Sequence, residues 1–174
     1  MDDLTSNSHG AAIAKIVPKK SRVVFGRRNF VIVASRFNAD YVQGLVEHAL
    51  SELRGDGSSA AVALHQVPGA FEIPIVVREI ALQKKADAII AMGVILKGKT
   101  DHAEHLARTV TDALQRIALE SGIPIINAVL SMKTEAQARE RCLEDNINRG
   151  TEAARAAIEI ANVMSELREK QAHG

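Results

Sequence analysis

The stretch ADAIIAMGVIL, residues 86–96, is apolar almost throughout and is closely followed by the polar turn GKTD, residues 98–101. A strand with one face in water alternates apolar and polar residues, so an unbroken apolar run indicates a strand covered on both faces, as in a parallel sheet. Three other runs are similarly apolar and rich in β-forming residues: FVIVAS (30–35), AAVALHQV (60–67) and PIINAVL (124–130). We therefore expect a parallel sheet at the centre of the fold.

Helical patterns separate and follow these four runs. Proline has no N–H to donate inside a helix, so Pro74 must lie near the start of the second one. Strands that alternate with helices through short connections predict right-handed crossovers and an α/β fold, a three-layer αβα sandwich around a mostly parallel four-stranded sheet. SRVVF (21–25) is expected to add an N-terminal edge strand. The expected helices cover about Ala39–Leu53, part of GAFEIPIVVREIALQKK (69–85), His102–Glu120, Thr134–Cys142 and Thr151–Lys170.

Length and composition narrow the class of protein. With 174 residues, we expect a flexible tail at 1–20 and a single domain at 21–174. A net charge of +1 and an aromatic content of 3% argue against nucleic acid as a partner. Cys142 is the only cysteine, which excludes an intrachain disulfide and favours a cytoplasmic setting. The polar first ten residues are unlike a signal peptide, and no apolar run approaches the ~20 residues of a membrane span.

The polar residues most suited to chemistry follow the ends of the expected strands. In open parallel sheets, ligands bind beyond the carboxyl ends of the strands, where the loops from neighbouring strands meet. Any site in this protein should therefore be built from those loops. They are SRFNAD (35–40), VPGAF (67–71), ILKGKTDH (95–102) and LSMKT (130–134).

The loop ILKGKTDH has two interpretations. Its glycine, lysines and threonine precede a helix N-terminus, where backbone N–H groups and the helix dipole favour a phosphate or carboxylate. It is not a Walker A loop, because the upstream glycine spacing is missing. The alternative is an ordinary helix start, with Thr100 or Asp101 as the N-cap and Glu104 completing a capping box.

His102 and His105 lie three positions apart, on one face of the expected helix. They could bind zinc together with a neighbouring acid, but catalytic zinc sites use three protein ligands, and no other histidine has a matching spacing. A single histidine that transfers protons beside a carbonyl substrate is the better chemical use of this position.

Three other positions also have an ordinary and a functional interpretation. Glu72 lies in the first turn of a helix, where an acid caps the helix dipole or accepts hydrogen bonds from a polyol. Phe37 follows a strand; core packing is the ordinary reading, and stacking on a flat ring is the alternative. Arg139 and Arg141 are either solvated or bind an anion over the strand ends.

Taken in order along the chain, these segments resemble the 6,7-dimethyl-8-ribityllumazine synthase family of riboflavin biosynthesis. The resemblance extends from about Phe30 to Val163. It implies a flavodoxin-like fold and a transferase that condenses 5-amino-6-ribitylaminouracil with 3,4-dihydroxy-2-butanone 4-phosphate, without a metal or organic cofactor. The segments that carry it are SRFN (35–38), VPGAFEIP (67–74), Gly98-x-Thr100-x-His102, Gly122-x-Pro124 and the pair Glu140-Arg141.

The resemblance also implies roles for residues that would hold the pyrimidine. Phe37 would stack on its ring, with Asn38 beside it, and Glu72 would accept hydroxyl groups of the ribityl chain. Further parts of this pocket would be the ribityl-lining residues Ala70 and Phe71 and the backbone groups of Val94 and Ile95.

The second substrate would be held at the other end of the site. His102 would move protons, and Arg141 would bind the phosphate from the side. Asn127 and Arg149 match positions through which a neighbouring subunit completes the site. The phosphate turn itself would consist of Gly98, Lys99 and Thr100.

Some residues depart from the family pattern. Asp101 puts an acid beside the phosphate turn, and Asn127 stands where an aromatic wall is frequent. Ala103 and His105 occupy rim positions that are often aromatic, and LEDNIN (143–148) lacks the usual glycines. Asp101 and Asn127 motivate a second hypothesis, a catalytically weakened binding or shell protein.

The family further implies a homo-oligomer, a pentamer or a multiple of it up to an icosahedral shell. Its active sites would lie between subunits. Riboflavin synthase is a candidate partner.

Overall fold

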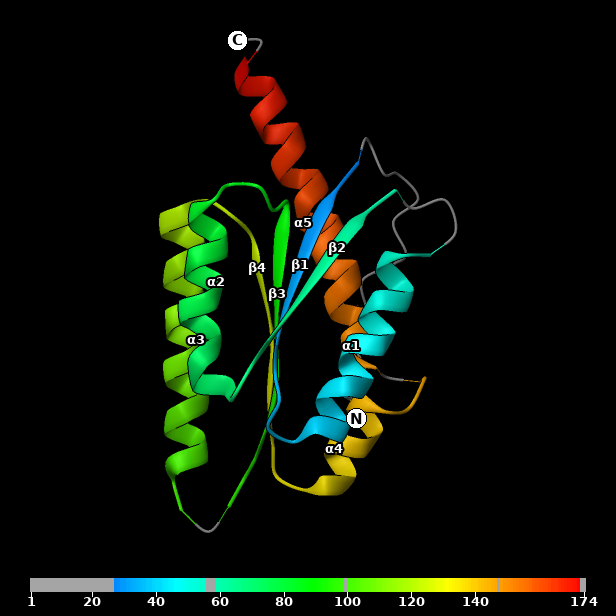
Figure 1. The fold of residues 1–174 in the computed structure, drawn as a ribbon, viewed down its shortest axis with the longest axis vertical. Coiled ribbons are helices and arrows are strands. Elements are labelled where there is room, and N and C mark those ends of the chain that lie inside the picture. Colours follow the sequence, from blue (N-terminus) through cyan, green and yellow to red (C-terminus); the bar gives the residue numbers. More distant parts are fainter. Residues whose placement is uncertain (1–26, 56–58, 99, 147, 173–174) are drawn as a thin grey trace, which may run out of the picture.

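The computed structural model describes residues 27–55, 59–98, 100–146 and 148–172 (Figure 1). Within them, four parallel strands form one sheet in the order β2-β1-β3-β4. The strands are β1 (Asn29–Ser35), β2 (Ala61–Val67), β3 (Ala88–Leu96) and β4 (Ile125–Met132). The helices are α1 (Ala39–Leu53), η1 (Ala70–Glu72), α2 (Ile73–Leu82), α3 (His102–Ser121), α4 (Glu135–Cys142) and α5 (Arg149–Ala172).

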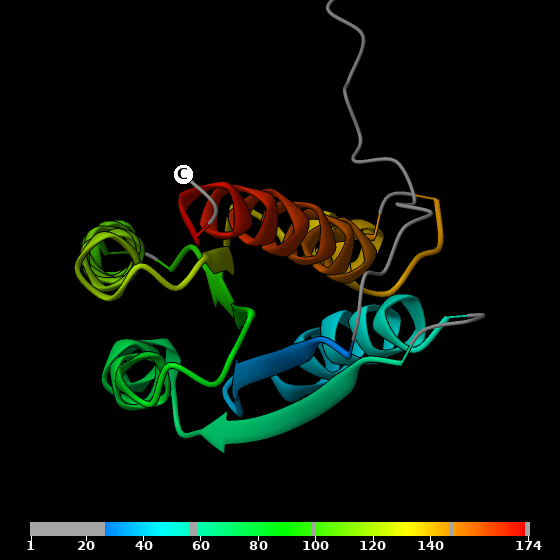
Figure 2. The same cartoon turned by 90° about the horizontal axis from the view of Figure 1, so that it is seen from above.

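Helices cover both faces of this sheet, which confirms the expected three-layer arrangement. α2 and α3 lie on one face, and α1, α4 and α5 lie on the other (Figures 1 and 2). Alternate residues of β3 supply the two cores: Ile90 and Met92 pack with α1 and α5, whereas Ile89 and Ala91 pack with α2 and α3. The unbroken apolar character of ADAIIAMGVIL therefore reflects a central strand buried on both faces.

β2 is not buried on both faces, so the expectation that AAVALHQV (60–67) forms a fully covered strand is wrong. Residues 63–66 are exposed, and Leu64 keeps 41% of its surface accessible. β2 pairs only with β1 in the described sheet and so forms an edge. The edge strand expected at SRVVF (21–25) and the tail at 1–20 lie outside the described residues.

The helix boundaries agree closely with the sequence patterns. α1 spans the expected Ala39–Leu53, and Pro74 lies in the first turn of α2, where its missing N–H costs little. α3 ends at Gly122, which adopts a left-handed φ of 68° that glycine tolerates well. No helix among the described residues is long and apolar enough to cross a membrane.

α5 approaches α1 so closely at Gly150 that only glycine fits. A Cβ atom added there would lie 2.1 Å from the Leu45 carbonyl oxygen, which belongs to the rigid backbone of α1. We expect Gly150→Ala to lower the free energy of unfolding by about 1–3 kcal/mol, as overpacking usually does. Urea denaturation would measure this. Gly98→Ala is the matched control, because an added Cβ there has nothing within 4 Å; equal stability of the two variants would contradict the close approach.

Candidate functional site

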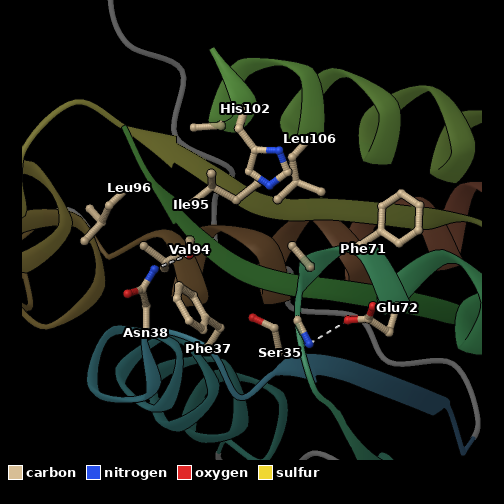
Figure 3. A pocket seen from close by; sticks show the side chains of 13 residues that line it. Ser35, Phe37, Asn38, Phe71, Glu72, Val94, Ile95, Leu96, His102 and Leu106 are labelled. Carbon is tan, nitrogen blue, oxygen red and sulfur yellow. Dashed lines mark hydrogen bonds between the residues drawn. The ribbon is translucent and has the colours of Figure 1, made fainter. Parts of the chain in front are cut away.

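A cavity of about 380 Å³ opens at the carboxyl ends of β1 and β3 (Figure 3). It lies where parallel sheets place their ligand sites, as the sequence predicted. Four segments supply its walls: the β1–α1 connection, η1, the end of β3 and the start of α3. Its lining residues are Ser35, Phe37, Asn38, Gly69, Ala70, Phe71, Glu72, Val94, Ile95, Leu96, His102, Ala103 and Leu106.

Two aromatic side chains line this cavity while remaining open to solvent. Phe37 is 71% exposed and Phe71 is 66% exposed, although phenylalanine is normally buried. The ordinary reading of Phe37 as a core residue is therefore wrong. An exposed ring beside a cavity is suited to stacking on a flat ligand.

Asn38 connects the first loop to the end of β3. Its backbone adopts the left-handed conformation, with φ 57° and ψ 47°, which asparagine tolerates better than most residues. Its side-chain amide donates a hydrogen bond of 2.7 Å to the Val94 carbonyl oxygen (Figure 3). This bond fixes the end of β3 against the loop that carries Phe37.

Glu72 contacts the start of a helix and also lines the cavity, whereas its role toward a polyol stays a prediction. Its Oε2 accepts a 2.8 Å hydrogen bond from the backbone N–H of Gly69, the residue that precedes η1, and so caps the start of this short helix. The same side chain lines the cavity next to Phe71. A carboxylate has about four acceptor sites on its two oxygens, so a capping carboxylate retains capacity to accept ligand hydroxyl groups.

His102 is the first residue of α3, and its ring points into the cavity near Ile95 and Leu106 (Figure 3). The N-cap is Asp101, as the ordinary interpretation of this turn allowed. Its side chain makes no capping hydrogen bond, so the capping box expected with Glu104 is wrong. His105 is exposed and does not line this cavity. In the part of the chain that the structure describes, no group of three or more His, Cys, Asp or Glu residues is placed to hold a metal ion.

Gly98 and Thr100, the two described residues of the predicted phosphate turn, do not line this cavity. Gly98 and Thr100 are exposed, and Lys99 lies outside the described residues. Thr100 lines a second, smaller cavity of about 210 Å³. That cavity shares Ala103 with the first and also contains Lys97, Asp101, Glu104, Ser131, Met132 and Lys133.

Three further predicted site residues do not line the main cavity in a single chain. Asn127 is exposed on β4 and donates a 3.0 Å hydrogen bond to the Thr111 hydroxyl of α3. Arg141 is half-buried near the end of α4, and Arg149 begins α5, where its guanidinium pairs with Glu152. Their roles remain predictions.

The cavity also includes residues that sequence reasoning missed. Leu106 lies one helical turn after His102, so helix periodicity could have indicated it. Ser35 is the last residue of β1 and the first of the segment SRFNAD (35–40), and its position at a strand end was the available signal. Gly69 and Leu96 complete the missed set.

Comparison with known proteins points to one family. Residues 27–165 match the family model described as 6,7-dimethyl-8-ribityllumazine synthase. A protein of Chloroherpeton thalassium with that name is 43% identical over 140 residues, which cover 79% of this chain and 90% of the relative. A protein of Leptothrix cholodnii with the same name is 42% identical over 137 residues, which cover 78% of this chain and 86% of the relative. In Nitrosospira multiformis, a third protein of this name is 40% identical over 141 residues, which cover 80% of this chain and 86% of the relative.

Proposed function

The chain belongs to the 6,7-dimethyl-8-ribityllumazine synthase family, and on that premise we propose that the cavity at the carboxyl ends of β1 and β3 is its active site. The reaction of the family condenses 5-amino-6-ribitylaminouracil with 3,4-dihydroxy-2-butanone 4-phosphate and releases phosphate and water. The observation that carries the assignment is the convergence of an exposed aromatic ring, a carboxylate and a histidine on one cavity. They are Phe37, Glu72 and His102.

The pyrimidine occupies the larger part of this cavity. Its flat ring stacks on Phe37, next to Asn38, and its polar edge meets backbone groups of Val94 and Ile95. The ribityl chain extends along Ala70, Phe71 and Glu72, and the Glu72 carboxylate accepts its hydroxyl groups. The fixed positions of Asn38 and Glu72 support this arrangement, because the hydrogen bonds to Val94 and from Gly69 hold both side chains before a ligand arrives.

His102 transfers protons between the two substrates. The 5-amino group attacks the ketone carbon of the four-carbon substrate, and the adduct loses water to form an imine. Loss of a proton and of phosphate follows, and closure of the second ring releases further water. Each step needs a proton to be removed from or delivered to the reacting atoms, which a histidine at the cavity wall does near neutral pH.

The phosphate group binds beyond His102, at the turn of Gly98, Lys99 and Thr100. Backbone N–H groups before the N-terminus of α3 and the dipole of that helix attract an anion. The Arg141 guanidinium binds the phosphate from the side through charge-assisted hydrogen bonds. The charge of Asp101 opposes phosphate, and Lys97, which lines the same small cavity, offsets it.

We also propose that a second copy of the chain completes each site. Asn127 and Arg149 do not line the cavity of their own chain, and in a closed ring they would face the cavity of a neighbour. The family implies a pentamer or a multiple of it. Native mass measurement would give the subunit number, and a monomeric mass for the active enzyme would contradict this assembly. Riboflavin synthase, which would consume the product, remains a candidate partner.

A cytoplasmic location accords with the single cysteine. Cys142 is a free, buried thiol, and burial raises its pKa to about 11 despite the nearby positive charge of Arg141. A thiol of such high pKa is largely protonated and unreactive at neutral pH.

The proposed reaction is tested by incubating the purified protein with both substrates. We expect the absorbance and fluorescence of the lumazine to grow faster than in a protein-free control, because the site holds both substrates and supplies a proton carrier. A rate equal to the protein-free background would sink this function and favour the second hypothesis of a binding or shell protein.

A further inference from the structure

Ser35 brings an unsatisfied hydroxyl group to the wall of the proposed active site. It is the last residue of β1 and lines the main cavity, although only 3% of its surface is exposed. Its Oγ is buried and has no hydrogen-bond partner among the described residues. A buried polar atom without a partner is costly and rare in proteins, so its retention at a cavity wall points to a partner that arrives with the ligand.

Gly93 of β3 is a near neighbour of this hydroxyl. A Cβ added to Gly93 would be 3.2 Å from the Ser35 Oγ, and the same point is 3.4 Å from Val129 Cγ1 and 3.5 Å from Ile73 Cδ1. On this side, the hydroxyl therefore faces a glycine that carries no side chain and has apolar atoms around it.

The position of Ser35 along the cavity indicates which part of a ligand it meets. In Figure 3 it lies on the cavity floor between Phe37, the proposed stacking ring, and Glu72, the proposed acceptor for the ribityl hydroxyls. In this view, a ligand that stacks on Phe37 and reaches Glu72 passes Ser35 between its ring and the far end of its chain. The segment at that point is the beginning of the ribityl chain.

We propose that the Ser35 hydroxyl hydrogen-bonds the ring-proximal end of the ribityl chain and so favours pyrimidines that carry a polyol. The inference rests on the proposed function of this cavity. A serine hydroxyl donates one hydrogen bond and accepts others, as a polyol hydroxyl does, so the two groups are complementary. Rotation about the Cα–Cβ bond moves the oxygen between staggered positions and allows it to follow the ligand.

Selectivity follows from the hydrogen bond that only a polyol can make. The hydroxyl is already buried without a partner in the free protein, so a pyrimidine with an alkyl group in place of the ribityl chain leaves it unpaired and gains nothing. A ligand that supplies the matching hydroxyl group removes this cost and binds more tightly. Ser35 thus acts in substrate selection, whereas proton transfer belongs to His102.

Equilibrium binding to the full-length protein tests the proposal. The probes are 6-ribitylaminouracil, which lacks the 5-amino group and cannot condense, and 6-methylaminouracil, which lacks the polyol. We expect Ser35→Ala to lower the affinity for the ribityl probe by about 3- to 10-fold in calorimetric titration, which corresponds to the usual net value of a neutral hydrogen bond. The methyl probe should bind both proteins equally, because it never paired with the hydroxyl.

Thermal stability of the unliganded proteins provides the second readout. Removing a hydroxyl that has no partner should leave the melting temperature of Ser35→Ala equal to or above that of the unchanged protein. A lower melting temperature with unchanged affinity for the ribityl probe would overturn the proposal, since the hydroxyl would then serve the fold. Failure of the unchanged protein to bind the ribityl probe at all would overturn the proposed function together with this inference.

Discussion

Replacement of His102 by alanine is expected to lower kcat by up to about 10²-fold while leaving the fold intact. Its ring points into the cavity from the first turn of α3, and its side chain is exposed, so its loss removes no core contact. General acid–base catalysis by one side chain typically contributes 10²–10⁴-fold. The lower end applies here, because an amine and a ketone held together already react without a catalyst.

His105→Ala is the matched control for this measurement. Both histidines belong to α3, both are exposed, and only His102 lines the cavity. Steady-state rates of lumazine formation should therefore fall for His102→Ala and stay near the original value for His105→Ala. A collapse of several further orders of magnitude for His102→Ala would show that the ring does more than carry protons. Equal losses in both variants would place the chemistry elsewhere.

The sequence predicted the architecture because two patterns in it agree. The apolar run of β3 required cover on both faces. The helices supplied that cover, with α2 and α3 on one face and α1, α4 and α5 on the other. Prediction was weaker for β2, whose apolar composition matches that of a buried strand although residues 63–66 are exposed. Composition does not distinguish the edge of a sheet from its centre, because that difference depends on strand order.

Within the site, the location could be predicted, but the interactions that fix it could not. Strand ends identified the loops that carry Phe37, Glu72 and His102. The hydrogen bond from Asn38 to the Val94 carbonyl depends on a left-handed backbone and on a contact between residues far apart in the chain. The unsatisfied hydroxyl of Ser35 likewise follows from its neighbours in space, Gly93 among them, which no local pattern specifies.

Arg141→Ala should raise the apparent KM for the phosphate substrate by roughly 10- to 100-fold, because a charge-assisted contact worth about 1.5–3 kcal/mol is lost. The KM for the pyrimidine should change little, since we propose that it binds at Phe37 and Glu72, which line the cavity, whereas Arg141 does not line it. α4 holds Arg141 in a defined position: the Thr134 hydroxyl accepts a hydrogen bond from the Gln137 N–H at its start, and Ala138 and Cys142 are buried beneath it.

Arg139→Ala is the control that separates a specific contact from a general loss of positive charge. Both arginines lie in the last turn of α4, but Arg139 is exposed and Arg141 is half-buried. If only the field of the helix attracted phosphate, the two variants would raise KM equally, and both effects would fade in high salt. A bidentate contact instead confines the rise in KM to the Arg141 variant.

An unchanged KM for Arg141→Ala would mean that the phosphate binds elsewhere. Because Arg141 does not line the cavity of its own chain, a rise in KM seen only with the assembled protein would identify the contact as one made across the boundary between two copies.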